Sequence, residues 1–98
     1  MTAGSPSILR TPGVLAQRLD DEIVLLDAER GHYFALNATG ARIWEWIGEE
    51  GAAVPALVQR LVEAYDVAPP EAERDVLELL RQLEAQGLIE RRGPGAAR

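Results

Sequence analysis

The chain has no cysteine and a single histidine, His32, among its 98 residues. The absence of cysteine excludes a disulfide framework, a thiolate nucleophile and a cysteine zinc site. One histidine among scattered carboxylates matches no metal-ligand spacing. The two serines, Ser5 and Ser7, lie far along the chain from any base that could activate them. We therefore expect a protein that is not an enzyme and needs no metal or cofactor.

Long hydrophobic runs are also missing from the sequence. No stretch approaches the ~20 apolar residues that are needed to span a bilayer. The N-terminal residues lack the uninterrupted apolar run of a secretory signal. We therefore expect a cytoplasmic protein that does not enter a membrane.

Lysine is absent, so all ten basic residues are arginines, and every one of the 16 acids lies between Asp20 and Glu90. Five arginines oppose the acids there, which leaves that region with a net charge of −11. Such a field repels phosphate backbones. The acidity therefore argues against a nucleic-acid partner, although it is equally consistent with a simple contribution to solubility.

The apolar fraction of 47% is enough for one small globular domain. Glycine and proline recur in residues 1–13 and again in the last residues, so we expect a flexible N-terminal segment over residues 1–13, a folded domain over 14–90 and a flexible tail over 91–98. The sequence predicts strands at 14–19, 23–26 and 32–36, the second of them rich in branched apolar residues. Residues 27–31 would form the loop of a hairpin, with Gly31 in the positive-φ conformation that such loops require.

Three helices are predicted after the strands. Asn37 is a good N-cap for a helix over about residues 38–49, and Pro55 suits the first turn of a second helix over 55–65. A third helix is expected over about residues 71–86, with Gly87 ending it. The predicted fold is therefore α+β and winged-helix-like, with a three-stranded antiparallel N-terminal sheet followed by three helices.

The third strand would be an edge of the sheet if the strands follow one another in sequence order. Its residues, HYFAL, include no carboxylate, lysine or proline, the groups that usually protect an edge from pairing. An unprotected edge can accept an extended peptide as an added strand. The alternatives are that the N-terminal segment or a second copy of the chain covers this edge.

The third helix offers a second surface beside this strand. Its core stripe is predicted to contain Ala72, Val76, Leu79, Leu80 and Leu83. The residues outside this stripe make one flank of the helix a candidate wall of a groove. Asp75 and Gln82 lie on one flank, while Leu77 and Glu84 lie on the other, and the spacing alone does not choose between them. Leu77 could also simply widen the buried face.

A signature of residues extends from the second strand to the end of the third helix. It comprises Leu26-Asp27, Gly31-His32-Tyr33-Phe34-Ala35-Leu36-Asn37, Thr39-Gly40 through Trp44-Glu45, Asp75-Val76, Leu79-Leu80, Leu83 and Gly87-Leu88-Ile89. Together these residues resemble the PqqD-like proteins, small recognition elements that hold the leader segments of ribosomally made, later modified peptides. The resemblance covers roughly residues 14–89.

This resemblance implies a winged-helix-like fold that binds a leader peptide as an added strand against the third strand, with the third helix closing the groove. It implies peptide contacts from His32, Tyr33, Phe34, Ala35, Leu36, Asp75, Leu79, Gln82 and Leu83. In that arrangement Asp75 would accept a hydrogen bond from a leader hydroxyl or pair with a leader cation. The other interpretation of Asp75 is a carboxylate that favours the first helical turn.

The hairpin and third strand look most like the free-standing recognition proteins of lasso-peptide clusters. Those proteins deliver the precursor to a cysteine protease that removes the leader. The alternative branch is the PqqD-type peptide chaperone, which presents its precursor to a radical S-adenosylmethionine enzyme. Two other classes remain: a dimerisation or scaffold module, and a winged-helix regulator, which the acidic third helix disfavours.

Overall fold

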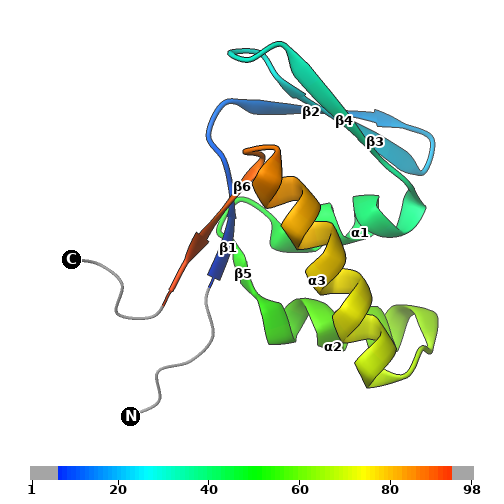
Figure 1. Ribbon diagram of the computed structural model, residues 1–98. Helices are drawn as coiled ribbons and strands as arrows, with labels where there is room; N and C mark the ends of the chain where they lie inside the picture. The colour runs from blue at the N-terminus through cyan, green and yellow to red at the C-terminus, as the bar shows by residue number, and fades with distance from the viewer. Residues whose placement is uncertain (1–6, 94–98) are drawn as a thin grey trace.

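The computed structural model describes residues 7–93 of the chain, and Figure 1 shows the arrangement of their strands and helices. In chain order the elements are β1 (Ser7–Arg10), β2 (Val14–Leu19), β3 (Glu22–Asp27), β4 (His32–Leu36), α1 (Ala38–Ile47), β5 (Ala52–Ala53), α2 (Val54–Tyr65), α3 (Pro69–Ala85) and β6 (Ile89–Arg92). The predicted α+β order, a three-stranded antiparallel sheet followed by three helices, is confirmed.

The first sheet has the strand order β2-β3-β4, so each strand pairs with its neighbour in sequence. The register places Leu25 of β3 between Ala16 of β2 and Phe34 of β4. At the β3–β4 loop, Gly31 has a φ of +73° and its amide donates to the carbonyl of Asp27 at 2.8 Å. Because nothing follows β4 in this order, β4 is an edge of the sheet, as predicted.

A second sheet, with the order β5-β1-β6, was not expected from the sequence. It corrects the predicted boundaries: Ser7–Arg10, assigned to a flexible N-terminal segment, forms the central strand, and residues 91–92, assigned to a flexible tail, belong to β6. Residues 1–6 and 94–98 lie outside the described residues. These short strands carry little signal of their own because each is stabilised by a partner distant in sequence: Ser7 pairs with both Ala53 and Arg92.

Capping side chains, glycine and proline determine where the helices begin and end. The side chain of Asn37 accepts a hydrogen bond from the amide of Gly40 at 2.9 Å, which confirms the predicted N-cap of α1. Helix α1 ends at Ile47, two residues earlier than expected, because Gly48 takes a φ of +64°. Helix α3 begins at Pro69, two residues earlier than expected, since a proline needs no amide partner in the first turn.

Gly87 ends α3 in a Schellman motif. Its φ is +75°, its amide donates to the carbonyl of Glu84 at 3.0 Å, and the amide of Leu88 donates to the carbonyl of Leu83 at 2.9 Å. The chain then turns back, so that Leu88 and Ile89 are both buried. The turn therefore directs β6 to its place beside β1.

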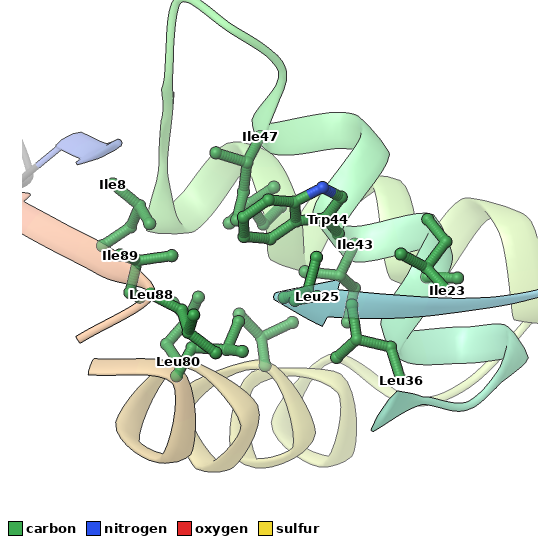
Figure 2. Close-up of a cluster of buried hydrophobic side chains, with 14 of the residues drawn as sticks. Ile8, Ile23, Leu25, Leu36, Ile43, Trp44, Ile47, Leu80, Leu88 and Ile89 are labelled. Atoms are coloured by element: carbon green, nitrogen blue, oxygen red, sulfur yellow. The ribbon is translucent and has the colours of Figure 1, made fainter. Parts of the chain in front are cut away.

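One core joins the two sheets and three helices. Figure 2 shows Trp44 of α1 among side chains from both sheets, with Leu80 of α3 across from them. Of the predicted α3 stripe, all but Leu79 are fully buried, and Leu79 is half-buried. Each fully buried aliphatic side chain contributes about 1.5–3 kcal/mol relative to an exposed one. Leu36 and Phe34 both face this core, although Phe34 is only half-buried.

Arg10 links the second sheet to α1. Its Nη2 donates to the carbonyl of Trp44 at 2.7 Å, and its guanidinium lies 4.5 Å from the centre of the Trp44 ring system. Burial lowers the pKa of Arg10, and the charge of Glu49 partly opposes this shift. The arginine therefore donates to a carbonyl oxygen near the end of α1, and this contact holds β1 against the helix.

Candidate functional site

The exposed edge at β4 has two different faces. His32, Phe34 and Leu36 lie on the face toward the helices, where Phe34 is half-buried and Leu36 is buried. Tyr33 and Ala35 lie on the opposite face, and the side chain of Tyr33 is 75% exposed. Because Leu36 is buried, only its backbone is placed to meet a partner at this edge.

A groove begins where β4 ends and lies between the start of α1 and the side of α3. Its volume is about 360 Å³. The residues that line it are Asn37, Thr39, Gly40, Ile43, Asp75, Glu78, Leu79 and Gln82. The groove therefore lies between α1 and α3, beside the residue that follows β4, and no residue of β4 lines it.

Helical spacing explains how α3 contributes to the groove. Asp75, Glu78, Leu79 and Gln82 stand at positions i, i+3, i+4 and i+7, which share one face of a helix. They flank the buried stripe, so Leu79 lies at the border between core and groove and is half-buried. One face of α3 thus supplies both an apolar contact and a polar wall.

Glycine at position 40 keeps the other wall close to β4. A Cβ atom placed there would lie 3.3 Å from Leu36 Cδ2 and 3.4 Å from Asn37 Oδ1. The first of these distances is tighter than ordinary van der Waals contact and the second is at its lower limit, so a side chain would push α1 away from β4. Gly40 therefore allows the first turn of α1 to pack directly beside the end of the edge strand.

The groove combines an apolar floor with an acidic wall. The half-buried Leu79 supplies the exposed apolar surface beside the buried Ile43, whereas Asp75 and Glu78 place two carboxylates on the α3 side. None of the groove residues in the described part of the chain is basic. The arrangement suits an apolar side chain of a ligand together with a hydroxyl, amide or cationic group beside it.

The structure brings together only some of the predicted site residues. Asp75, Leu79 and Gln82 all line the groove. Leu83 does not, because its side chain is fully buried in the core and offers no surface to a ligand. The other flank of α3 does not line the groove. On that flank, Oε1 of Glu84 lies 3.3 Å from Nη2 of Arg91.

Sequence reasoning missed the contribution of α1 and of Glu78. Asn37 carried only a helix-cap assignment, and Thr39, Gly40 and Ile43 were named only as part of the signature. Ile43 lies four residues after Thr39 and three after Gly40, so it shares a helix face with each of them. Recognising this face of α1 as the second wall of the groove requires knowing that α3 lies opposite it. Glu78 could have been found, because it lies at i+3 from Asp75 and i−4 from Gln82.

A second hollow, of about 410 Å³, lies on the outer face of the first sheet. Its lining is Leu15, Ala16, Gln17, Leu19, Val24, Leu26 and Tyr33. Within this lining, Tyr33 is the residue that connects the hollow with the edge strand β4.

Within residues 7–93, no three histidine, cysteine, aspartate or glutamate side chains gather in a way that could hold a metal ion. Over the same residues, no helix is long and apolar enough to cross a membrane.

Comparison with known proteins places this site in context. A family model described as "Coenzyme PQQ synthesis protein D (PqqD)" matches residues 22–89. No curated protein matches the chain. One similar solved structure is TbiB1 in complex with the TbiA(beta) leader peptide, at 36% identity and a TM-score of 0.78, covering 84% of this chain and 94% of that one. Another is lasso peptide synthetase B1 complexed with the leader peptide, at 30% identity and a TM-score of 0.75, covering 85% and 96% of the two chains.

Proposed function

Since the chain belongs to the PqqD family, we propose that it is a non-catalytic protein that binds the leader segment of a ribosomally synthesised precursor peptide. The observation that carries this proposal is the edge strand β4, which is followed by Asn37 in the lining of the groove between α1 and α3. The two similar proteins that were solved with leader peptides support it.

The leader adds as a further strand beside residues His32–Leu36. Main-chain hydrogen bonds to β4 supply affinity without regard to sequence, each with a net contribution of about 0.5–1.5 kcal/mol. Alternate leader side chains point to opposite faces of the extended sheet. Those on the inner face meet the helices, whereas those on the outer face lie level with Tyr33 and Ala35.

The groove beside α1 and α3 supplies sequence preference. An apolar leader side chain packs on Leu79, and Asp75 accepts a hydrogen bond from a leader hydroxyl or pairs with a leader cation. Gln82 can donate or accept beside it. The acidic wall formed by Asp75 and Glu78 disfavours leaders that place a carboxylate at the same position.

We further propose that the precursor belongs to a lasso-peptide cluster and that the bound leader is presented to a cysteine protease that removes it. Holding the leader raises the local concentration of the rest of the precursor at the enzyme, so the protein would accelerate maturation by tethering. The alternative within the family is presentation to a radical S-adenosylmethionine enzyme. The lasso assignment is supported by the similarity to lasso peptide synthetase B1.

Two functions of other classes fit the structure less well. A winged-helix DNA reader needs basic contacts, but the described α3 carries Asp75, Glu78 and three further glutamates against two arginines. A dimerisation module would use β4 to pair with a second copy. Such self-pairing would be visible as a dimer that a leader peptide converts to a monomer.

The decisive test is a titration of fluorescently labelled leader peptide, followed by polarisation. The probe is the synthetic TbiA(beta) leader, with a scrambled peptide of the same composition as the control. Saturable binding at micromolar or tighter affinity, with at least tenfold weaker binding of the scrambled peptide, is the expected result. Equal binding of the scrambled and native peptides would contradict leader recognition.

A further inference from the structure

Two arginine side chains lie over the ring system of Trp46 on α1. The guanidinium of Arg42, on the same helix, is 5.5 Å from the centre of the ring, and that of Arg60, on α2, is 5.2 Å from it. Trp46 is half-buried, whereas both arginines are exposed. The indole therefore holds two cations close together at the surface where α1 packs against α2.

Neither arginine has a carboxylate partner in the part of the chain that the structure describes, where every ion pair within 4 Å involves another arginine. The acidic residues that follow each of them by three positions are engaged elsewhere. Glu45 pairs with Arg18, and Glu63 accepts a hydrogen bond from the side-chain amide of Gln59 at 2.8 Å. The two arginines therefore form a local positive site on a chain whose net charge is −6.

The chemistry of this Arg-Trp cluster (Arg42, Trp46 and Arg60) indicates what it can bind. A guanidinium over an aromatic ring is held through its charge and its flat face, so its in-plane N–H donors stay available for two parallel bonds to a carboxylate. Among residues 7–93, neither arginine side chain donates a hydrogen bond. The cluster therefore fits a segment that presents a carboxylate together with an apolar group for the indole.

The cluster lies on the same side of α1 as the groove. Thr39, which lines the groove, precedes Arg42 by three residues and Trp46 by seven, and these spacings place all three on one side of the helix. In Figure 1, α1 begins directly after β4. The distance along α1 from Thr39 to Trp46 is about 10 Å, which about three or four extended residues span. A peptide that leaves the β4 edge beside Leu36 is therefore within reach of the cluster.

We propose that the Arg-Trp cluster is a subsite for an acidic residue of the precursor peptide, beyond the segment that pairs with β4. This inference rests on the proposed leader-binding function. The two parts of the site then differ in charge: the acidic wall of Asp75 and Glu78 disfavours a carboxylate, whereas the cluster binds one. Opposite charges at two points along the peptide fix its direction and register on the protein.

The test places a charge at each position of the peptide. The TbiA(beta) leader, extended by four glycines at each end so that it spans the distance to the cluster, is synthesised with Glu at each position in turn and, in a matched series, with Gln. The Kd of every peptide is measured by polarisation for the wild type and for Arg42→Gln/Arg60→Gln. The control is Arg74→Gln/Arg81→Gln, which removes the same charge from exposed arginines of α3 that do not line the groove.

In the wild type, Glu should bind more tightly than Gln by about fivefold or more at one or two neighbouring positions toward one end of the peptide. The Arg42→Gln/Arg60→Gln variant should lose this preference and bind the glycine-extended leader without Glu or Gln within about twofold of the wild type. The Arg74→Gln/Arg81→Gln control should keep the preference.

Three results would overturn the proposal. They are no preference for Glu at any position, a preference that Arg42→Gln/Arg60→Gln retains, and a preference that both double variants lose equally, because that loss would reflect net charge alone. A wild-type dimer that Arg42→Gln/Arg60→Gln dissociates in light scattering would also overturn it, since carboxylates of a second copy would then occupy the cluster. If the wild type binds none of the peptides, the proposed leader-binding function is wrong and this inference falls with it.

Discussion

The two sheets of this small domain are assembled in opposite ways. The β2-β3-β4 sheet is made by two successive hairpins, has one packed face and presents an edge and exposed apolar side chains to solvent. The β5-β1-β6 sheet gathers three short strands from the beginning, middle and end of the described chain. Its central strand carries Ile8, which is fully buried among residues of α1, α3 and β6.

The two sheets therefore have different expected roles: the first offers a surface for binding, and the second closes the domain. Local hairpins can leave their outer surfaces unpaired because their register is set by short turns. The second sheet contributes stability by bringing the two ends of the domain together, so its side chains are used in packing. Substitutions in the second sheet should therefore change the free energy of unfolding, whereas substitutions at the edge of the first sheet should change peptide binding.

The largest effect on stability is expected for Ile8→Ala. Removing a fully buried isoleucine side chain should lower the free energy of unfolding by about 2–5 kcal/mol, measured by urea denaturation. The control in the other sheet is Leu15→Ala, because the side chain of Leu15 is mostly exposed. This substitution should lower the free energy of unfolding by less than about 0.5 kcal/mol. Equal, small effects of both substitutions would mean that β1 is not part of the cooperative unit.

Gly51→Ala probes the close approach of the chain to β1. Gly51 has a φ of +90°, and a Cβ atom there would lie 2.6 Å from Leu9 Cδ2 and 2.8 Å from the carbonyl oxygen of Ile8. Strain and steric displacement should together lower the free energy of unfolding by about 2–4 kcal/mol.

Gly13→Ala is the matched control for this substitution. Gly13 has a similar φ of +87°, but a Cβ atom placed there would meet nothing within 4 Å, so only the backbone strain of about 1–2 kcal/mol remains. A thermal-denaturation series that ranks Gly13→Ala as equally or more destabilising would contradict the close packing of Gly51 against β1.

Ala35→Pro tests strand addition at the edge of the first sheet. Loss of a main-chain donor and the bulk of the ring should weaken leader binding by roughly a hundredfold, while circular dichroism reports whether the fold is retained. Ala35→Val keeps the amide and should bind leader within about threefold of the wild type.

Leader peptides with single N-methylated residues provide the same test without altering the protein. Methylation at alternate positions should abolish binding, whereas methylation at the intervening positions should be tolerated. Uniform tolerance along the peptide, or normal binding by a folded Ala35→Pro variant, would exclude strand addition.

The smallest effect is expected in the groove. Asp75→Asn should weaken leader binding by about 1 kcal/mol if the carboxylate accepts one leader hydrogen bond, measured by isothermal titration calorimetry. Glu84→Gln removes the same charge from the opposite flank of α3 and should leave the affinity unchanged. A larger loss for Glu84→Gln than for Asp75→Asn would place the leader on the other side of the helix.

Much of the first sheet could be predicted because its signals are local. The strands β2 and β4 have the expected bounds, and Asn37 caps α1 as its position after a strand predicts. The second sheet could not be predicted in this way. Ser7 and Ala53 lie in strands of four and two residues, too short for an alternating pattern, and their pairing depends on contacts between distant segments.

The candidate site shows the same division. Helical spacing placed Asp75 and Gln82 on one flank of α3 but left the flank of Leu77 and Glu84 as an alternative. The resemblance to the PqqD-like proteins was what singled out Asp75, Leu79 and Gln82. Leu83 was assigned to the same site, but it lies in the core. Whether a residue at the border of an apolar stripe faces core or groove depends on how far the neighbouring helix extends over it.

The sequence by itself determined the elements whose energetics are local: the hairpins, the caps, the amphipathic faces and the absence of thiol chemistry. The tertiary structure alone decided which flank of α3 meets α1, that residues 7–10 close the domain with β6, and that Leu15, Leu26 and Tyr33 align in one exposed row. These features depend on long-range packing and strand register, in which residues distant in sequence become neighbours only after the core has formed.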